Sequence, residues 1–374
     1  MHLVRIEALN FRNLSGAIEF APGLNLLFGQ NAQGKTNWLE AAFLLATTKS
    51  FRTTFVREAI RYGSEDAIIR GTIKENTYTK DLQILITEKS KQTFVNGKRE
   101  PVVDYLGHLG AIAFTVDDLE VVRGGPDARR RFIDRGLVGI KPSYLGTLSA
   151  YNRVLKHRNK LLRDAASSEH PLAYAPQVEA WNDQFASLGT EIHEARVSYV
   201  ERLKEAVDAR FFKAESVAVR YRSSLESKGD SAGYEELFRE RLAFHLRNEL
   251  ATGHTLVGPH RDDLEIRFDE REVSKFASRG QQRSALLVLD IAQIKVYNSV
   301  LGYYPVFLID DIDAELDRSR IEILLDYLEG KTQTIVSTSK RSVAERYSGV
   351  GELRHISAGI ASDPHASNSN VALS

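Results

Sequence analysis

A phosphate-loop pattern near the N-terminus constrains this chain more than any other sequence feature. Residues 29–36 fit G-x-x-x-x-G-K-[ST], with an apolar run at 24–28 before them and a helical pattern at 38–45 after them. A strand, a glycine-containing loop and a helix in this order favour bound phosphate, because loop amides and the helix N-terminus both attract negative charge. The pattern predicts an α/β nucleotide-binding domain. Taken alone, it also fits a glycine-containing turn before a surface helix.

Each part of this loop has an expected contact with a nucleotide. The Lys35 ammonium would reach the β- and γ-phosphates of ATP, and the Thr36 hydroxyl would ligate Mg²⁺. Backbone amides of the loop would supply the remaining phosphate contacts. The predicted cofactor-binding residues are Gly29, Gln30, Asn31, Ala32, Gln33, Gly34, Lys35 and Thr36.

Two adjacent carboxylates follow a second apolar run. Residues 305–309 predict a buried strand, and Asp310 and Asp311 come directly after it. The carboxyl end of a central strand is where an α/β nucleotide site needs a metal partner. We predict that Asp310 holds Mg²⁺, directly or through water, and that Asp311 orients or deprotonates the attacking water. Taken alone, the pair also fits an exposed acidic turn at a strand end.

The rest of the chain divides into mixed and helical stretches. Residues 1–125 and 251–357 show short strand and helix patterns, whereas 126–250 has long helical patterns. Within 178–195, apolar residues recur at alternating spacings of three and four, which predicts a helix packed lengthwise on a partner helix. We expect a discontinuous head domain from the two mixed stretches, an inserted helical arm at 126–250, and a disordered tail at 358–374, which is rich in Ala, Ser and Asn.

Composition excludes several classes of protein. The 50 Lys and Arg residues balance 50 Asp and Glu residues, so the chain is not a polycation that binds nucleic acid through bulk basicity. Cysteine is absent, which excludes a disulfide framework and any Cys-ligated metal site. Residues 1–7 alternate apolar and polar side chains, unlike a signal peptide, and no apolar run is long enough to span a membrane. We expect a soluble, cytoplasmic protein.

A third motif gives the others a family context. Ser278, Gly280 and Gln281 begin a helical pattern, for which a simple N-cap is the alternative explanation. The order of phosphate loop, long insertion, Ser-x-Gly-Gln and Asp pair resembles the ABC-type ATPase heads. The resemblance implies an α/β, ABC-type P-loop ATPase head with an inserted helical, short coiled-coil-like arm. It also implies a homodimer that forms with ATP and Mg²⁺, in which Ser278, Gly280 and Gln281 of one head cap the γ-phosphate bound by the other.

Within that class, the sequence is similar to the RecF family over residues 1–355. The similar segments are Gly34-Lys35-Thr36-Asn37, Lys49-Ser50-Phe51-Arg52, residues 123–126 and 129–134, Tyr151 with 155–162, and residues 258–264. The resemblance adds Asn37 to the nucleotide contacts. It implies an ATP-dependent DNA-binding protein of DNA repair, recombination and replication. Such a protein would be an ATP-gated clamp at single-stranded or gapped DNA or a duplex junction, would help to load recombinase, would support the SOS response, and would have RecO and RecR as partners.

The resemblance also exposes departures and alternatives. Where transporter heads carry a His after the next strand, this chain has Thr338, a poor base near neutral pH. We therefore predict weak ATP hydrolysis that acts as a switch, with Asp311 and Thr338 as the catalytic residues. Relatives usually carry a Pro where this chain has Val116. The alternatives are an ABC transporter ATPase subunit, which the long insertion and the absent His disfavour, another SMC-like ATPase, and a nuclease, which would need a further acidic metal cluster.

Basic residues cluster in the predicted arm. On a helix, positions 153, 156, 160 and 163 share one face, which would neutralise several DNA phosphates and make affinity fall with salt. We expect recognition of DNA backbone and shape rather than base sequence. A solvated face paired with neighbouring acids is the alternative. His254 and His260 lack metal-ligand spacing and are expected to hydrogen-bond in turns. The predicted DNA contacts are Arg129, Arg130, Arg153, Lys156, Arg158 and Lys160.

Overall fold

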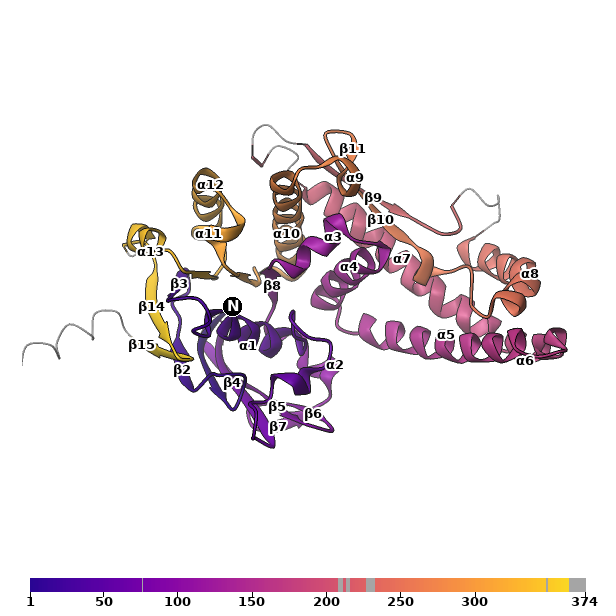
Figure 1. Cartoon of the computed structure of the whole chain (residues 1–374), viewed down its shortest axis with the longest axis horizontal. Coiled ribbons are helices and arrows are strands. Elements are labelled where there is room, and N and C mark those ends of the chain that lie inside the picture. Colours follow the sequence, from indigo (N-terminus) through magenta and orange to yellow (C-terminus); the bar gives the residue numbers. More distant parts are fainter. Residues whose placement is uncertain (76, 208–210, 213–215, 227–232, 348, 363–374) are drawn as a thin grey trace, which may run out of the picture.

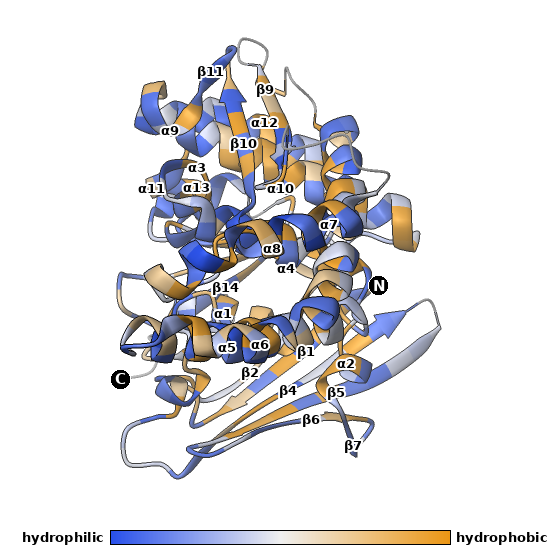
Figure 2. Cartoon of the chain, turned by 90° about the vertical axis from the view of Figure 1, so that its right-hand side faces the viewer, coloured by the Kyte–Doolittle hydropathy of each residue, from blue (hydrophilic) through white to orange (hydrophobic). Residues whose placement is uncertain are grey.

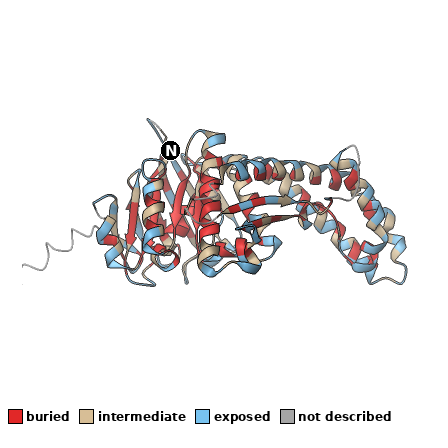
Figure 3. Ribbon diagram, turned by 90° about the horizontal axis from the view of Figure 1, so that it is seen from above, coloured by how far each residue is buried: buried red, intermediate tan, exposed pale blue. Residues whose placement is uncertain are grey.

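Two sheets with a helix between them form one end of the molecule, and a helical arm extends from it (Figure 1). The structure is a computed structural model that describes residues 1–75, 77–207, 211–212, 216–226, 233–347 and 349–362. Figure 3 shows buried residues concentrated in the strands of the head, whereas the arm helices alternate buried and exposed positions. The head therefore has a thick core, and the arm has a thin one.

A six-stranded sheet carries the phosphate loop. Its strand order is β15-β14-β3-β13-β12-β8, and every neighbouring pair is parallel except β14 with β15. The strands are β3 (Leu24–Phe28), β8 (Ala111–Phe114), β12 (Val306–Ile309), β13 (Thr334–Thr338), β14 (Glu352–Ser357) and β15 (Ile360–Ser362). The apolar runs predicted as strands at 24–28 and 305–309 are β3 and β12. Because β3, β13 and β12 are adjacent and parallel, their carboxyl ends meet at one edge of the sheet.

Helix α1 (Lys35–Thr47) lies between this sheet and an antiparallel one. Every residue of α1 from Trp38 to Ala46 is buried, and the helix contacts strands of both sheets. From Trp38 to Ala46 the helix is apolar except for Glu40, so burial on both sides is its stable position. The antiparallel sheet consists of β2 (Gly16–Glu19), β1 (His2–Leu9), β4 (Asp66–Glu75), β5 (Tyr78–Thr87), β6 (Lys91–Val95) and β7 (Lys98–Glu100).

The arm is built from antiparallel helices. They are α4 (Pro126–Ile140), α5 (Tyr144–Ala166), α6 (Ala175–Glu179), α7 (Asn182–Ala206) and α8 (Tyr234–Thr252). Phe185 and Ile192 of the predicted heptad stripe are buried on α7, which packs along α5, as expected. The stripe is not one helix, however, because Val178 belongs to α6, which also contacts α5. Figure 2, which views the arm end-on, shows hydrophilic and hydrophobic stripes on these helices.

A small sheet crosses the expected boundary between arm and head. β9 (Val217–Arg222), from a stretch predicted as helical, pairs antiparallel with β10 (Asp263–Phe268), and β10 pairs with β11 (Arg271–Glu272). β9 contacts α7 and β10 contacts α4, so both strands pack on arm helices. We propose that the inserted unit extends to Glu272 and that the head resumes with α9 (Val273–Phe276) and α10 (Arg279–Leu301).

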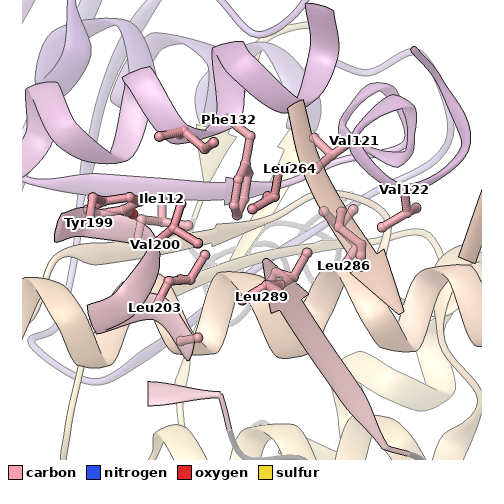
Figure 4. Packing of buried hydrophobic residues seen from close by; sticks show 14 of the residues in the cluster. Ile112, Val121, Val122, Phe132, Tyr199, Val200, Leu203, Leu264, Leu286 and Leu289 are labelled. Carbon is pink, nitrogen blue, oxygen red and sulfur yellow. The ribbon is translucent and has the colours of Figure 1, made fainter. Parts of the chain in front are cut away.

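Helix α10 joins the arm to the head. Its Leu286 and Leu289 pack in one cluster with side chains of α3 (Glu120–Arg123), α4, α7 and β10 (Figure 4). By length and composition α10 could span a membrane, but 72% of its most apolar window is buried, which is the property of a core helix. The remaining elements are α2 (Val102–Tyr105), α11 (Ile312–Glu315), α12 (Arg318–Leu328), α13 (Arg341–Tyr347) and the 3₁₀ turns at Val56–Ala59, Asp117–Leu119, Pro171–Tyr174 and Pro259–Arg261.

The segment at residues 258–264 is hydrogen-bonded to two arm helices, α5 and α7. His260 Nδ1 shares a 2.8 Å hydrogen bond with the Tyr151 hydroxyl, and its Nε2 lies 3.3 Å from the Thr255 carbonyl oxygen. Arg196 NH1 donates to the Pro259 carbonyl oxygen at 2.6 Å. The expectation of a hydrogen-bonded His260 is thus confirmed. Among the described residues, no His, Asp and Glu cluster has a metal-binding arrangement. Burial lowers the pKa of His260 from 6.5 to about 4.

This pKa shift predicts a pH-dependent stability. The unfolded chain takes up the His260 proton near pH 6.5, whereas the folded chain resists it until about pH 4. The stability contributed by the neutral ring is therefore complete above pH 6.5 and is lost as the pH falls toward 4, by at most about 3 kcal/mol. We expect His260→Gln, which removes the titrating group, to flatten the difference in urea unfolding free energy between pH 7 and pH 5. Equal pH slopes for the two proteins would contradict the assignment.

Candidate nucleotide-binding site

The phosphate loop curls between the end of β3 and the start of α1. Ala32 and Gly34 adopt left-handed backbone angles, with φ of 64° and 105°. A Cβ on Gly29 would lie 2.3 Å from the Ile356 carbonyl oxygen, so the approach of β14 requires glycine there. The curl brings Lys35 back over the loop, where its Nζ donates to the carbonyl oxygens of Gly29 at 2.8 Å and Gln30 at 2.9 Å.

The charge of Lys35 faces the acids at the strand ends. Burial lowers the pKa of Lys35, and the negative charges of Asp311, Asp310 and Asp313 oppose that shift. A buried ammonium needs such partners to remain charged. The loop and the strand-end carboxylates therefore belong to one electrostatic site, as the sequence predicted.

Asp310 joins three neighbouring strand ends. Thr36 Oγ1 donates to Asp310 Oδ1 at 2.9 Å, and Ser337 Oγ donates to the same oxygen at 2.7 Å. The Asp311 amide donates to Ser337 Oγ at 2.8 Å. Burial raises the pKa of Asp310, whereas the two hydroxyl donors lower it. Thr36 and Asp310 are thus brought together as predicted. Ser337 was missed, although a polar residue at the end of a buried strand was an available signal.

These oxygens suit a hard divalent cation. Mg²⁺ prefers oxygen ligands and usually takes one or two protein ligands, with phosphate and water completing its shell. Thr36 offers a hydroxyl and Asp310 a carboxylate, 2.9 Å apart. The residues present therefore fit the metal that the sequence implies.

The two predicted catalytic residues lie in different surroundings. Asp311 has a left-handed backbone, with φ 53° and ψ 50°, and starts α11. Thr338 is fully buried at the end of β13, and its hydroxyl donates to Asp313 Oδ1 at 2.6 Å. The Lys340 amide donates to Thr338 Oγ1 at 3.2 Å. A bond from Thr338 to a γ-phosphate would require this hydroxyl to leave Asp313, so that role stays a prediction.

The segment after β14 corrects the prediction of a disordered tail. Residues 360–362 form β15, which pairs with β14, and the turn between the strands reaches the phosphate loop. The Ala358 and Gly359 amides donate to the side-chain and main-chain oxygens of Gln33, both at 2.7 Å. The prediction was wrong for 358–362, because composition does not reveal hydrogen bonds to a distant loop. Residues 363–374 lie outside the described residues.

A buried glutamate organises the side of α1 near Asn37. Glu40 is fully buried and accepts from Arg12 Nε at 3.0 Å, from Arg12 NH2 at 2.9 Å and from Ser50 Oγ at 2.5 Å. Arg52 NH1 lies 3.7 Å from Glu40 and donates to Asn37 Oδ1 at 2.6 Å. The Asn37 side chain is therefore held beside the loop by residues that the sequence did not single out as a site.

Comparisons with known proteins agree with this geometry. The family model described as "RecF/RecN/SMC N terminal domain" matches residues 2–361. A protein described as "DNA replication and repair protein RecF" from Lactobacillus johnsonii is 34% identical over 349 residues, covering 91% of this chain and 92% of the relative. Its counterpart from Staphylococcus carnosus is 36% identical over 348 residues, covering 91% and 93%. The chain belongs to the RecF family.

Solved structures give the same family. One described as the "recombination mediator protein RecF-ATP in RecFOR pathway" has a TM-score of 0.85 and 31% identity, with 96% of this chain and 97% of that chain covered. Another, described with "RecF-ATPrS", has a TM-score of 0.87 and 30% identity, with 97% and 98% covered. An SMC head domain from Pyrococcus furiosus shares the fold, with a TM-score of 0.53 at 14% identity. The predicted ATPase-head fold is confirmed.

In this RecF-family chain, the Ser-x-Gly-Gln segment is separate from the chain's own phosphate loop. Ser278 Oγ accepts from the Gln281 amide at 3.3 Å, and Gln281 Oε1 accepts from the Ser278 amide at 2.9 Å, which is a complete capping box. No hydrogen bond joins residues 278–281 to residues 29–36 within the described chain. Arg283 instead pairs with Glu315 of α11 at 2.8 Å. The segment is partly exposed to solvent at the surface of the head.

Three of the predicted DNA contacts have acidic partners within the arm, and full burial makes the prediction wrong for Arg158 alone. Arg158 is fully buried and pairs with buried Glu249 at 3.2 Å. Because it is buried, Arg158 cannot present its charge to DNA, and replacing it would cost about 3–5 kcal/mol because Glu249 would keep a buried charge without its ionic partner. Arg129 donates to both carboxylate oxygens of Asp263, at 2.6 and 2.8 Å. Arg130 pairs with Asp127, and its side chain is only 14% exposed.

The other three predicted contacts form an exposed row on α5. Arg153, Lys156 and Lys160 are all exposed, whereas Tyr151 and Val154 of the same helix are buried. Within the part of the chain that the structure describes, none of the three has an acidic partner within ion-pair distance. These three side chains are therefore not paired with acids of neighbouring helices, which was the alternative explanation. The residues' role toward DNA stays a prediction.

Proposed function

We propose that this RecF-family chain is an ATP-dependent DNA-binding protein of DNA repair, recombination and replication, in which bound ATP acts as a switch. The observation that carries the proposal is the 2.9 Å contact between Thr36 of the phosphate loop and Asp310, the residue after β12. It puts the two oxygen ligands expected for the Mg²⁺ of a bound nucleotide side by side. A structural neighbour that is described with ATP supports the choice of nucleotide.

Different residues of the chain would contact different parts of the nucleotide. The loop amides and Lys35 would bind the β- and γ-phosphates, while Thr36 and Asp310 hold Mg²⁺. Bound Mg²⁺ would neutralise charge on the phosphates. Asp311 would orient the attacking water, and Thr338 offers only a buried hydroxyl already bonded to Asp313. Asp311 is then the one candidate base in this set, without a histidine to assist it, which favours slow hydrolysis and a long-lived ATP state.

Two heads would close around ATP. Among the described residues, the capping segment at residues 278–281 makes no hydrogen bond to its own phosphate loop, and it is partly exposed, so it is available to a second copy. A closed homodimer would align two α5 rows on one DNA molecule, at a single strand, a gap or a duplex junction. Its partners would be RecO and RecR, in line with the RecFOR pathway named for the structural neighbours, and its task would be loading recombinase in the cytoplasm, including during the SOS response.

Removing the loop ammonium tests the switch. We expect Lys35→Ala to lower ATP affinity at least tenfold, because charge-assisted contacts to phosphate are worth about 1.5–3 kcal/mol. ATP-dependent dimers should disappear with it. Lys89→Ala, at an exposed position in the antiparallel-sheet region, is the control. Sedimentation velocity with and without MgATP reports the dimer. A Lys35→Ala protein that dimerises like the control would rule out the sandwich.

Neutralising the α5 row tests the DNA surface. We expect the triple variant Arg153→Gln, Lys156→Gln and Lys160→Gln to weaken DNA binding and to reduce the salt slope by roughly 1 for each lost phosphate contact. The matched control removes the same charge from the antiparallel-sheet region, at Lys89, Lys98 and Arg99, which are exposed. Fluorescence anisotropy at several salt concentrations measures both quantities. Equal slopes for the two triple variants would move the DNA surface elsewhere.

A further inference from the structure

The turn between β14 and β15 is bonded to the phosphate loop and to α1. The Gly359 amide donates to the Gln33 carbonyl oxygen, and the Ala358 amide donates to Gln33 Oε1, both at 2.7 Å. Trp38 Nε1 donates to the Gly359 carbonyl oxygen at 3.2 Å. Gln33 is thus held by both its main chain and its side chain, and the turn is held in return by α1.

The turn is a tight hairpin that packs closely on the phosphate loop and on Asn13. Ala358 and Gly359 both have left-handed backbones, with φ of 49° and 80°, as in a two-residue hairpin turn of type I′. A Cβ on Gly359 would lie 2.1 Å from the Asn13 carbonyl oxygen. A Cβ on Gly34 would lie 3.1 Å from the Gly359 Cα atom, so loop and turn approach closely. Glycine at position 359 is therefore required by the contact as well as by the turn.

Because a peptide group is planar, the bond from Gly359 to the Gln33 carbonyl oxygen also sets the direction of the Gly34 N–H, a potential donor to phosphate. The Gln33 carbonyl and the Gly34 N–H belong to one trans peptide and point in opposite directions. When Gly359 holds the Gln33 oxygen on the turn side, the Gly34 N–H must point to the other side, into the loop. Gly34 is the residue before the start of α1, where amides that face the loop are the donors to phosphate.

We propose that the β14–β15 turn is a positioning element of the nucleotide site. It fixes the Gln33–Gly34 peptide so that the Gly34 N–H is aimed at phosphate before a nucleotide binds. The Gln33 side chain then serves the turn and not the nucleotide. This inference rests on the proposed function, because it assumes that the loop binds ATP.

Two variants and two controls test the proposal. Gln33→Ala removes the acceptor for the Ala358 amide, and Gly359→Ala forces the turn away from Asn13. Gln177→Ala, on exposed α6, and Gly302→Ala, at another left-handed glycine with open space, are the matched controls. We expect MgATP affinity to fall about fivefold in Gln33→Ala, the value of one hydrogen bond, and further in Gly359→Ala. The controls should bind as the wild type does. Circular dichroism melting identifies a variant that fails to fold. If Gly359→Ala fails to fold, the affinity of Gln33→Ala decides the test.

Hydrogen exchange at the turn distinguishes a positioning role from a purely structural one, because a purely structural turn would exchange at the same rate with and without MgATP. If the turn strengthens MgATP binding, MgATP must strengthen the turn by the same factor, because coupling between two binding sites is reciprocal. MgATP should therefore slow hydrogen exchange at the Ala358 and Gly359 amides of the wild-type protein. The expected factor is about the loss of MgATP affinity in Gln33→Ala. A wild type that binds no ATP would refute the proposed function itself. A wild type that binds ATP, with Gln33→Ala binding equally well or with exchange in the turn unchanged, would overturn the positioning role alone.

Discussion

The bond from Thr36 to Asp310 connects parts of the chain that are 274 residues apart. Asp310 can accept from both Thr36 and Ser337 only because β3, β13 and β12 are adjacent and end at the same edge of the sheet. The carboxylate is buried, and burial alone would favour its neutral form. The two hydroxyl donors and the positive charge of Arg52 lower the pKa and oppose that tendency. A buried carboxylate at this position therefore depends on the donors that the fold brings to it. Asp310 in turn links α1 to the centre of the sheet.

A continuous series of contacts leads from this site to the arm. Asp311 begins α11, and Glu315 at the end of α11 pairs with Arg283 near the start of α10. The opposite part of α10 is packed into the cluster shared by α3, α4, α7 and β10 (Figure 4). A rotation of α10 would move its capping segment and the arm together, because packed cores resist internal deformation. This arrangement gives the proposed switch a physical route between nucleotide and DNA surface.

The sequence was sufficient where function depends on local pattern. The loop, the helix after it and the acids after an apolar strand are contiguous motifs, and the fold brought Thr36 and Asp310 together as predicted. It was insufficient where partners are distant. Arg158 has the helical spacing of the buried Val154 and Leu162, and only the distant Glu249 explains why an arginine can occupy a position on that face. The contact from Gly359 to Gln33 joins a segment of coil-like composition to a loop 326 residues earlier, which no local pattern could indicate.

The dependence of DNA binding on ATP tests the central claim most directly. DNA affinity of the unmodified protein should be measured with and without MgATP across a series of salt concentrations. If ATP closes two heads and aligns two cationic rows, MgATP should raise the affinity and steepen the slope of log affinity against log salt, since more phosphates are neutralised at once. The same affinity and the same slope in both conditions would contradict the account.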